Sequence, residues 1–247
     1  MAGHSKWKQI KHYKAATDAK RGALFTKLIR EITVAAKFGG GDPDGNPRLR
    51  TAIDAARAAS MPKENIERAV KKGTGELEGV DYQEIVYEAY GPAGVALMIA
   101  TLTDNPNRTV GEIRAKLSRG GGNLGAANSV AWMFDRKGQI YLDATRYDED
   151  TTLEQALDAG AEDFVREDEQ YVVTTEPSQL HAVKGALESH GVVAVEAELA
   201  WIPKNTVRVE GKDAETLIRL LGALEDLDDV QKVDANFDMD VSEMAKA

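Results

Sequence analysis

The chain has 247 residues, no cysteine and a formal net charge of −10. Its length suffices for one large domain or for two to three small ones. The lack of cysteine excludes disulfides, thiolate nucleophiles and cysteine-based zinc sites. The N-terminal residues lack the apolar stretch of a secretory signal, and no apolar run approaches the roughly 18 residues of a membrane span. We therefore expect a cytoplasmic protein with no membrane partner.

The charge is divided unevenly along the chain. Residues 1–72 contain 16 Lys and Arg against 7 Asp and Glu, whereas the remaining residues contain 15 against 34. The result is a head of net charge +9 and a body of net charge −19. A basic head on an acidic body predicts an anionic partner for the head alone. The acidic body would repel phosphate and limit non-specific binding.

The first 77 residues are predicted to form a domain of three helices. Apolar residues recur at three- and four-residue spacing over residues 22–37, which is the period of an α-helix. The Gly- and Pro-rich stretch of residues 39–47 ends that helix. A second helix is expected from Pro47, which suits a first turn, to Ala59. A third is expected from Pro62 to about Lys72.

Strands and helices alternate after this domain. Strands are predicted at residues 84–90 and 95–102, followed by a helix that ends at Arg119. We expect Thr109 to be the N-cap of that helix, in a capping box with Glu112.

The fold class predicted is α+β and multidomain. Residues 132–205 show the order β-α-β-β-α-β of a ferredoxin-like unit. Residues 78–131 contain too few strands for a stable sheet, and the strand-helix-strand segment within residues 206–247 would complete it. We therefore expect a three-helix domain (1–77), a discontinuous α/β domain (78–131 and 206–247) and an inserted ferredoxin-like domain (132–205).

The basic head contains the strongest candidate site. On a helical wheel the cations of the first helix share one side, opposite its apolar residues, and are expected to face solvent. The preceding arm combines lysines with Trp7 and Tyr13, which suit phosphate contact and base stacking. The candidate nucleic-acid-binding residues are Lys6, Trp7, Lys8, Lys11, Lys14, Lys20, Arg21, Lys27, Arg30, Lys37, Arg48, Arg50 and Arg57. The alternative is a solvated helix face preceded by a disordered basic tail.

A second candidate lies between a predicted buried strand and the helix that follows it. Asn105, Asn107 and Arg108 in this turn could present polar groups to an anion at the helix N-terminus. The alternative is that the asparagines only shape the turn while Thr109 caps the helix.

The sequence offers no catalytic, metal or cofactor site. The glycine pattern at Gly120, Gly122 and Gly125 follows a helix and precedes a strand, which is the inverse of the dinucleotide-binding context. The four histidines lack zinc-ligand spacing, and no nucleophile elbow is present. We expect a non-enzymatic protein.

Many short motifs together resemble the YebC/PmpR family. They include Gly3-His4-Ser5-Lys6-Trp7, Gly39-Gly40-Gly41-Asp42-Pro43, Asn46-Pro47-Arg48-Leu49-Arg50, Tyr87-Glu88-Ala89-Tyr90-Gly91-Pro92, Asn107-Arg108-Thr109 and Gly121-Gly122-Asn123-Leu124-Gly125. The resemblance implies the same three-domain fold. It also implies a probable DNA-binding transcriptional regulator.

The resemblance implies a second role too, because relatives that include the mitochondrial translational activator of cytochrome c oxidase act on the ribosome. The alternative is therefore a ribosome-associated translation factor that binds ribosomal RNA and relieves stalling at proline-rich stretches. A third hypothesis is a protein-interaction module whose acidic body contacts a basic partner. The residues themselves do not decide between DNA and ribosomal RNA, and they leave the oligomeric state open.

Overall fold

The computed structural model describes residues 18–240. It is a mixed α/β fold, in which the described residues form seven α-helices and several antiparallel pairs of strands. The chain divides into two compact units: unit 1 comprises residues up to 134 and from 203 onward, and unit 2 comprises residues 135–202. Of the helices in residues 18–240, none combines the length and the apolar character needed to cross a bilayer.

Unit 1 begins with three helices, α2 (Asp18–Gly39), α3 (Pro47–Ala58) and α4 (Lys63–Thr74). Their shared core includes Ile32, Leu49 and Ile66. The loop between α2 and α3 is fixed by the buried Asn46, whose side chain accepts a hydrogen bond from the Leu49 amide and donates to the carbonyls of Ala35 and Gly40. Asn46 thus caps α3 and satisfies carbonyls at the end of α2.

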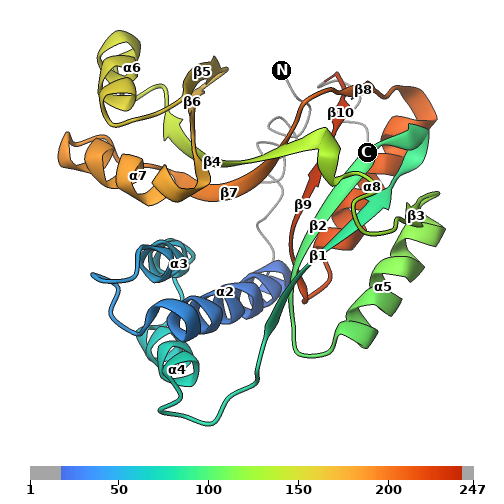
Figure 1. The fold of residues 1–247 in the computed structure, drawn as a ribbon, viewed down its shortest axis with the longest axis horizontal. Coiled ribbons are helices and arrows are strands. Elements are labelled where there is room, and N and C mark those ends of the chain that lie inside the picture. The colour runs from blue at the N-terminus through green and yellow to red at the C-terminus, as the bar shows by residue number, and fades with distance from the viewer. Residues whose placement is uncertain (1–17, 241–247) are drawn as a thin grey trace. The chain divides into compact units, whose positions relative to one another are not determined.

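The rest of unit 1 is built on a four-stranded antiparallel sheet with the order β3-β1-β2-β9. Helices α5 and α8 lie beside β1 and β2 (Figure 1). The apolar side chains of both helices, such as Ile113 and Leu217, share one core with Leu97 and Ile99 of β2. The elements are β1 (Gln83–Tyr90), β2 (Ala96–Thr103), α5 (Pro106–Arg119), β3 (Asn123–Leu124), α8 (Gly211–Glu225) and β9 (Val230–Ala235). Two short strands, β8 (Val207–Arg208) and β10 (Phe237–Asp238), pair in parallel.

Unit 2 has a four-stranded sheet with the order β5-β6-β4-β7. Its elements follow the chain order β-α-β-β-α-β of a ferredoxin-like unit. They are β4 (Phe134–Asp143), α6 (Glu149–Asp158), β5 (Asp163–Glu167), β6 (Gln170–Thr175), α7 (Leu180–Ser189) and β7 (Glu196–Pro203). Alternate residues of β4 and β6, such as Ile140 and Val173, share a core with Val183 and Leu187 of α7. Short 3-10 helices cover Pro92–Gly94, Ala131–Met133 and Pro177–Gln179.

The start of α5 differs from the prediction. The N-cap is Asn105 and not Thr109, because the Asn105 side chain accepts the Arg108 amide and Pro106 occupies the first turn. Asparagine is a strong N-cap residue and proline suits the position that follows it. The predicted capping box with Glu112 is therefore wrong. The Thr109 hydroxyl is instead bonded to Asp229.

A glycine sets the distance between α2 and α4. A Cβ atom at Gly73 would lie 2.4 Å from the Thr33 carbonyl oxygen and 2.7 Å from the Ala36 Cβ. We expect Gly73→Ala to lower the free energy of unfolding by about 1–3 kcal/mol, because this overpacking outweighs the better helix propensity of alanine. Urea denaturation checks this.

Gly111 in α5 is the matched control, because a Cβ atom there would meet no atom within 4 Å. Gly111→Ala is expected to raise the free energy of unfolding by about 0.5–1 kcal/mol. Equal effects of the two substitutions would contradict the packing argument.

Candidate nucleic-acid interface

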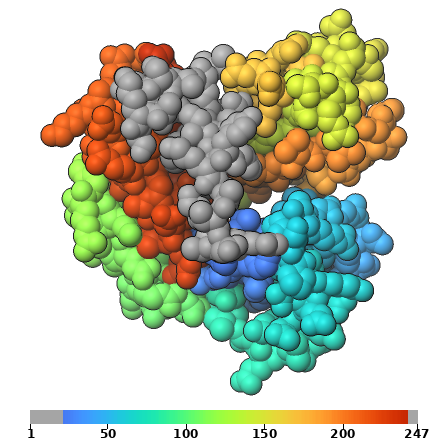
Figure 2. Space-filling view, turned by 180° about the vertical axis from the view of Figure 1, so that it is seen from behind, coloured from blue at the N-terminus to red at the C-terminus, as the bar shows by residue number. Residues whose placement is uncertain are grey.

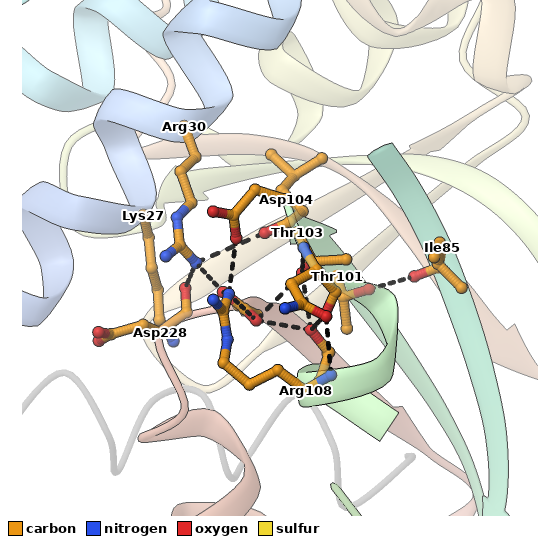
Figure 3. A network of polar contacts seen from close by, with 12 residues as sticks. Lys27, Arg30, Ile85, Thr101, Thr103, Asp104, Arg108 and Asp228 are labelled. Atoms are coloured by element: carbon orange, nitrogen blue, oxygen red, sulfur yellow. Dashed lines mark hydrogen bonds and ion pairs between the residues drawn. The ribbon is translucent and has the colours of Figure 1, made fainter. Parts of the chain in front are cut away.

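Two cations of α2 contact the turn between α8 and β9. The Arg30 guanidinium lies 2.6 Å from Asp229 Oδ1 and also donates to the Asp228 carbonyl, while the Lys27 ammonium donates to the Glu225 carbonyl (Figure 3). The Arg30 side chain is only 11% exposed. The expectation that this side of α2 faces solvent is therefore wrong for Arg30. The turn before β9 supplies a buried carboxylate, Asp229, at that position.

Asp229 is the centre of a polar cluster that we call the Asp229 latch: Asp229 with its donors Arg30, Arg108, Thr103 and Thr109 (Figure 3). Its carboxylate accepts from Arg108 Nη2 at 2.8 Å and from the Thr109 and Thr103 hydroxyls at 2.6 and 3.1 Å. The side chain is 2% exposed. A buried carboxylate with this many donors remains charged.

The surroundings lower the pKa of Asp229. Burial alone would raise it, but the hydrogen bonds from Thr109 and Arg108 and the positive charges of Arg30 and Arg108 outweigh burial. The latch is therefore a charged link between the helical domain and the sheet of unit 1, and two of its donors come from the start of α5.

The latch also accounts for the turn before α5. Asn105 caps the helix, and the Arg108 guanidinium is shared between Asp229 and Asp104, with 2.7 Å to the Asp104 carboxylate. Both residues thus shape this turn. Asn107 has an exposed side chain.

Two further cations of the head are paired with acids near the start of β1. Arg48 contacts Glu31 through two nitrogens, at 2.7 and 3.2 Å, and Glu84 through a third at 2.6 Å. Burial opposes the charge of Arg48, but the two glutamates outweigh burial and raise its pKa. Lys37 forms an ion pair with Asp81. These pairs attach the helical domain to the segment that enters the sheet.

The cations of α3 and its preceding loop are more exposed. Arg57 is 71% exposed and lies 3.4 Å from Asp54, and Arg50 donates to the carbonyls of Pro43 and Asp44. In the described part of the chain, these two are the predicted site residues whose guanidinium groups lie on the surface of α3, away from the sheet domain's acids.

Four exposed cations on α4 were not predicted as site residues: Lys63, Arg68, Lys71 and Lys72. The adjacent lysines Lys71-Lys72 are the sequence signal that could have indicated this surface. Lys63 lies 3.5 Å from Glu67, so the charges of these two residues offset each other. Arg57, Lys63 and Lys71 line an open cavity of about 450 Å³, together with two acidic residues, Glu67 and Glu76, and apolar residues that include Ile53, Met61 and Ile66. Figure 2 shows α3 and α4 on the molecular surface.

The remaining predicted site residues precede the well-described part of the chain. Lys6, Trp7, Lys8, Lys11 and Lys14 lie outside the described residues. Lys20 and Arg21 belong to the first turn of α2, and their side chains lie outside the described part as well. Of the 16 cations in residues 1–72, 12 fall within residues 18–72.

The Asp229 latch predicts a pH-dependent contribution to stability. Asp229→Asn should lower the free energy of unfolding at pH 7 by roughly 1.5–3 kcal/mol, because the hydrogen bonds to a charged acceptor are removed. The pKa of Asp229 is lower in the folded state than its unfolded value of about 3.9. Its contribution is therefore complete above about pH 5 and is lost as the pH falls through the folded pKa.

The measurement is urea denaturation of both proteins across this pH range. The difference between them should be constant above about pH 5 and shrink below it. Asp228→Asn is the control, because Arg30 contacts the main-chain carbonyl of Asp228 and its side chain is exposed. A pH-independent difference for Asp229→Asn would contradict the charged latch.

Comparison with known proteins identifies the family. Residues 5–76 match the model of the TACO1/YebC protein N-terminal domain, and residues 82–237 match that of the TACO1/YebC second and third domain. The chain is 66% identical to a probable transcriptional regulatory protein of Gemmatimonas aurantiaca over the whole of both chains. It is 56% identical to one of Geobacter sulfurreducens, over 100% of this chain and 99% of that one.

A solved structure is similar as well. The crystal structure of a conserved hypothetical protein from Aquifex aeolicus is 50% identical, with a TM-score of 0.84 over 90% of this chain and 92% of that chain. These matches confirm the resemblance drawn from the sequence motifs, and the chain belongs to the TACO1/YebC family, which is the YebC/PmpR family.

Proposed function

We propose that the chain is a non-enzymatic regulator of gene expression that binds nucleic acid through its helical domain and the basic residues before it. The observation that carries this proposal is the exposed cationic surface of α3 and α4, with Arg57, Lys63 and Lys71 around one cavity. Relatives that share the full length of the chain are named probable transcriptional regulatory proteins, which supports the regulatory role. DNA is the partner we propose first.

The contacts made by α2 change which cations we propose as phosphate-binding residues. Arg30 and Lys27 bind acceptors at the end of α8 and in the turn that follows it. Lys37 and Arg48 form ion pairs with acids near the start of β1. These residues orient the helical domain, and the phosphate contacts fall to the cations of the α3–α4 surface: Arg50, Arg57, Lys63, Arg68, Lys71 and Lys72. The lysines at 6, 8, 11 and 14, with Lys20 and Arg21, extend this set, and Trp7 supplies a group for base stacking.

Ribosomal RNA is the second candidate partner, and the composition of α4 favours keeping it. A helix that reads the major groove of DNA presents Arg, Asn or Gln to base edges near its start. Helix α4 begins with Lys63 and Glu64, and its exposed residues carry charges of both signs, with Glu64 and Glu67 beside four cations. Contacts to the phosphate backbone suit such a surface, and those contacts serve structured RNA equally well. In this role the chain would act on the ribosome and relieve stalling at proline-rich stretches.

The proposal includes a non-enzymatic role. Within residues 18–240, no group of three or more His, Asp and Glu is arranged to hold a metal ion. Two aspartates of the described residues are buried, Asp229 and Asp234. The oxygens of Asp229 are filled by donors from the chain itself, and Asp234 lies 2.9 Å from the Lys232 ammonium.

Neutralising the α3–α4 surface tests the proposal. The variant Arg57→Gln, Lys63→Gln, Lys71→Gln, Lys72→Gln should bind a labelled 20-base-pair DNA duplex on the order of tenfold or more weakly at 0.1 M salt. The slope of log affinity against log salt should fall by about 0.9 for each phosphate that the variant no longer neutralises. Fluorescence anisotropy over a salt series measures both quantities, and a matched RNA duplex compares the two partners.

The control variant neutralises four exposed cations of the acidic body, Arg114, Arg119, Lys212 and Arg219. It changes the net charge by the same amount and should retain the affinity. Equal reductions in both variants would show a general charge effect, and an unchanged affinity in the first would remove the α3–α4 surface from the interface.

Crosslinking in cells followed by sequencing separates the two partners. Reads concentrated at promoters support DNA, whereas reads concentrated in large-subunit ribosomal RNA support the ribosomal role.

A further inference from the structure

A segment between α5 and β4, which we call the strap (residues 121–132), is held tightly yet ends in an exposed tryptophan. The side chain of Trp132 is 65% exposed. Trp132 donates its indole N–H to the Ser129 carbonyl at 3.1 Å, and Tyr90 donates its hydroxyl to the same carbonyl at 3.0 Å. The indole ring is thus anchored at one edge, with much of its apolar surface in solvent.

Glu88 of β1 fixes the path of the strap. Its carboxylate accepts the backbone N–H groups of Asn128, Val130 and Ala131 at 2.6, 2.7 and 2.8 Å. Its carbonyl accepts the Gly125 amide at 2.8 Å. Burial alone would raise the pKa of Glu88, but these N–H groups outweigh burial and lower it. The carboxylate therefore remains charged and holds the strap at neutral pH.

Two glycines let the strap approach this closely. A Cβ atom at Gly122 would lie 2.4 Å from the Tyr90 carbonyl oxygen, and one at Gly125 would lie 3.3 Å from the Glu88 carbonyl oxygen. Short pairing of β3 with β1 adds to these contacts, with Leu124 opposite Ala89. Close packing and many hydrogen bonds thus fix the position of a tryptophan that lies outside the core.

The composition of the strap indicates the kind of partner. Residues 120–134 contain no charged residue, although 29% of the chain is charged. Apart from Trp132, the exposed residues of the strap are small or carry an amide: Gly121, Asn123, Ala126, Ala127 and Asn128. A segment without cations has no group of its own to neutralise phosphate. Protein interfaces, in contrast, have cores depleted of charge and centred on aromatic residues, and antibody loops combine Gly, Ser and Asn with aromatic anchors.

We propose that the strap is a docking surface for a second, different protein, which receives the Trp132 indole in an uncharged apolar pocket. The internal hydrogen bond of the indole N–H leaves only its ring for contact, so the pocket needs no hydrogen-bond acceptor. The pre-ordered strap lowers the entropy cost of docking. This surface is separate from the α3–α4 surface and serves a different class of partner.

The experiment places a photo-crosslinking amino acid, p-benzoylphenylalanine, at position 132 of the full-length chain in cells that naturally produce it. The control carries it at position 38, because Phe38 is also exposed, at 69%. We expect a discrete adduct with one other protein from position 132 and none with that protein from position 38. Adducts with nucleic acid, with a second copy of this chain or with its own residues 135–202, or no adduct, would overturn the proposal.

The protein identified in the adduct is then purified and its affinity measured by calorimetry. Trp132→Ala should weaken binding about 30-fold, which is ~2 kcal/mol, whereas Trp132→Phe should retain most of the affinity. Glu88→Ala, which loosens the strap and keeps the tryptophan, should weaken binding as well. Equal affinities of the wild type and Trp132→Ala would overturn the proposal even if an adduct forms.

A second arm tests base stacking directly. The variant Trp7→Phe, Trp201→Phe leaves Trp132 as the only tryptophan, since the chain has three. Titration with a 20-residue oligo(dT) or oligo(U) should leave its fluorescence unchanged. Quenching would show that nucleobases stack on Trp132 and would overturn the protein-docking proposal. Trp132→Ala should retain the affinity for nucleic acid, so this test is independent of the proposed function.

Discussion

The buried carboxylate of Asp229 is the interaction on which the arrangement of unit 1 depends. Removing a carboxylate from water costs several kcal/mol, and only well-placed donors offset that cost. Asp229 receives them from Arg30 on α2, Thr103 at the end of β2, and Arg108 and Thr109 on α5. The charge is satisfied only when the helical domain, the sheet and α5 are all in place. The latch thus specifies how the helical domain is set against the sheet, whatever its net contribution to stability.

The same interaction explains why the expectation that Arg30 faces solvent is wrong. A helical wheel gives the direction of a side chain but not its partner, and Arg30 meets a carboxylate 199 positions away in the chain. Asp229 follows Asp226 and Asp228 and had the pattern of solvated surface charge. The sequence does not distinguish a cation that pairs with a buried acid of the same chain from a cation that is exposed and free to contact phosphate. Only the fold separates Arg30, which is buried, from Arg57, which is exposed.

The helices and strands were more predictable than the site, because they follow from local patterns. Apolar spacing and glycine or proline breaks located α2, α3 and α4 to within a few residues. The alternation of strands and helices likewise indicated the mixed α/β fold. The error at α5 arose where two local signals competed, since Asn105-Pro106 and Thr109-Glu112 both resemble helix starts. The buried Asp229 took the Thr109 hydroxyl, and no local pattern could show that.

The distribution of charge then assigns different tasks to different surfaces. Fields from exposed charges are screened within about 8 Å at physiological ionic strength, so an acidic body repels phosphate only where the two come close. A cationic surface on α3 and α4 can therefore bind a polyanion although the whole chain carries −10. The strap differs from the α3–α4 surface because it carries no charged residue. The strap has no electrostatic attraction for a polyanion. A protein that docks on it does not have to desolvate charged side chains of the strap. In our two proposals, nucleic acid binds the α3–α4 surface and a protein binds the strap, and the segregated charge keeps these two surfaces from competing for one partner.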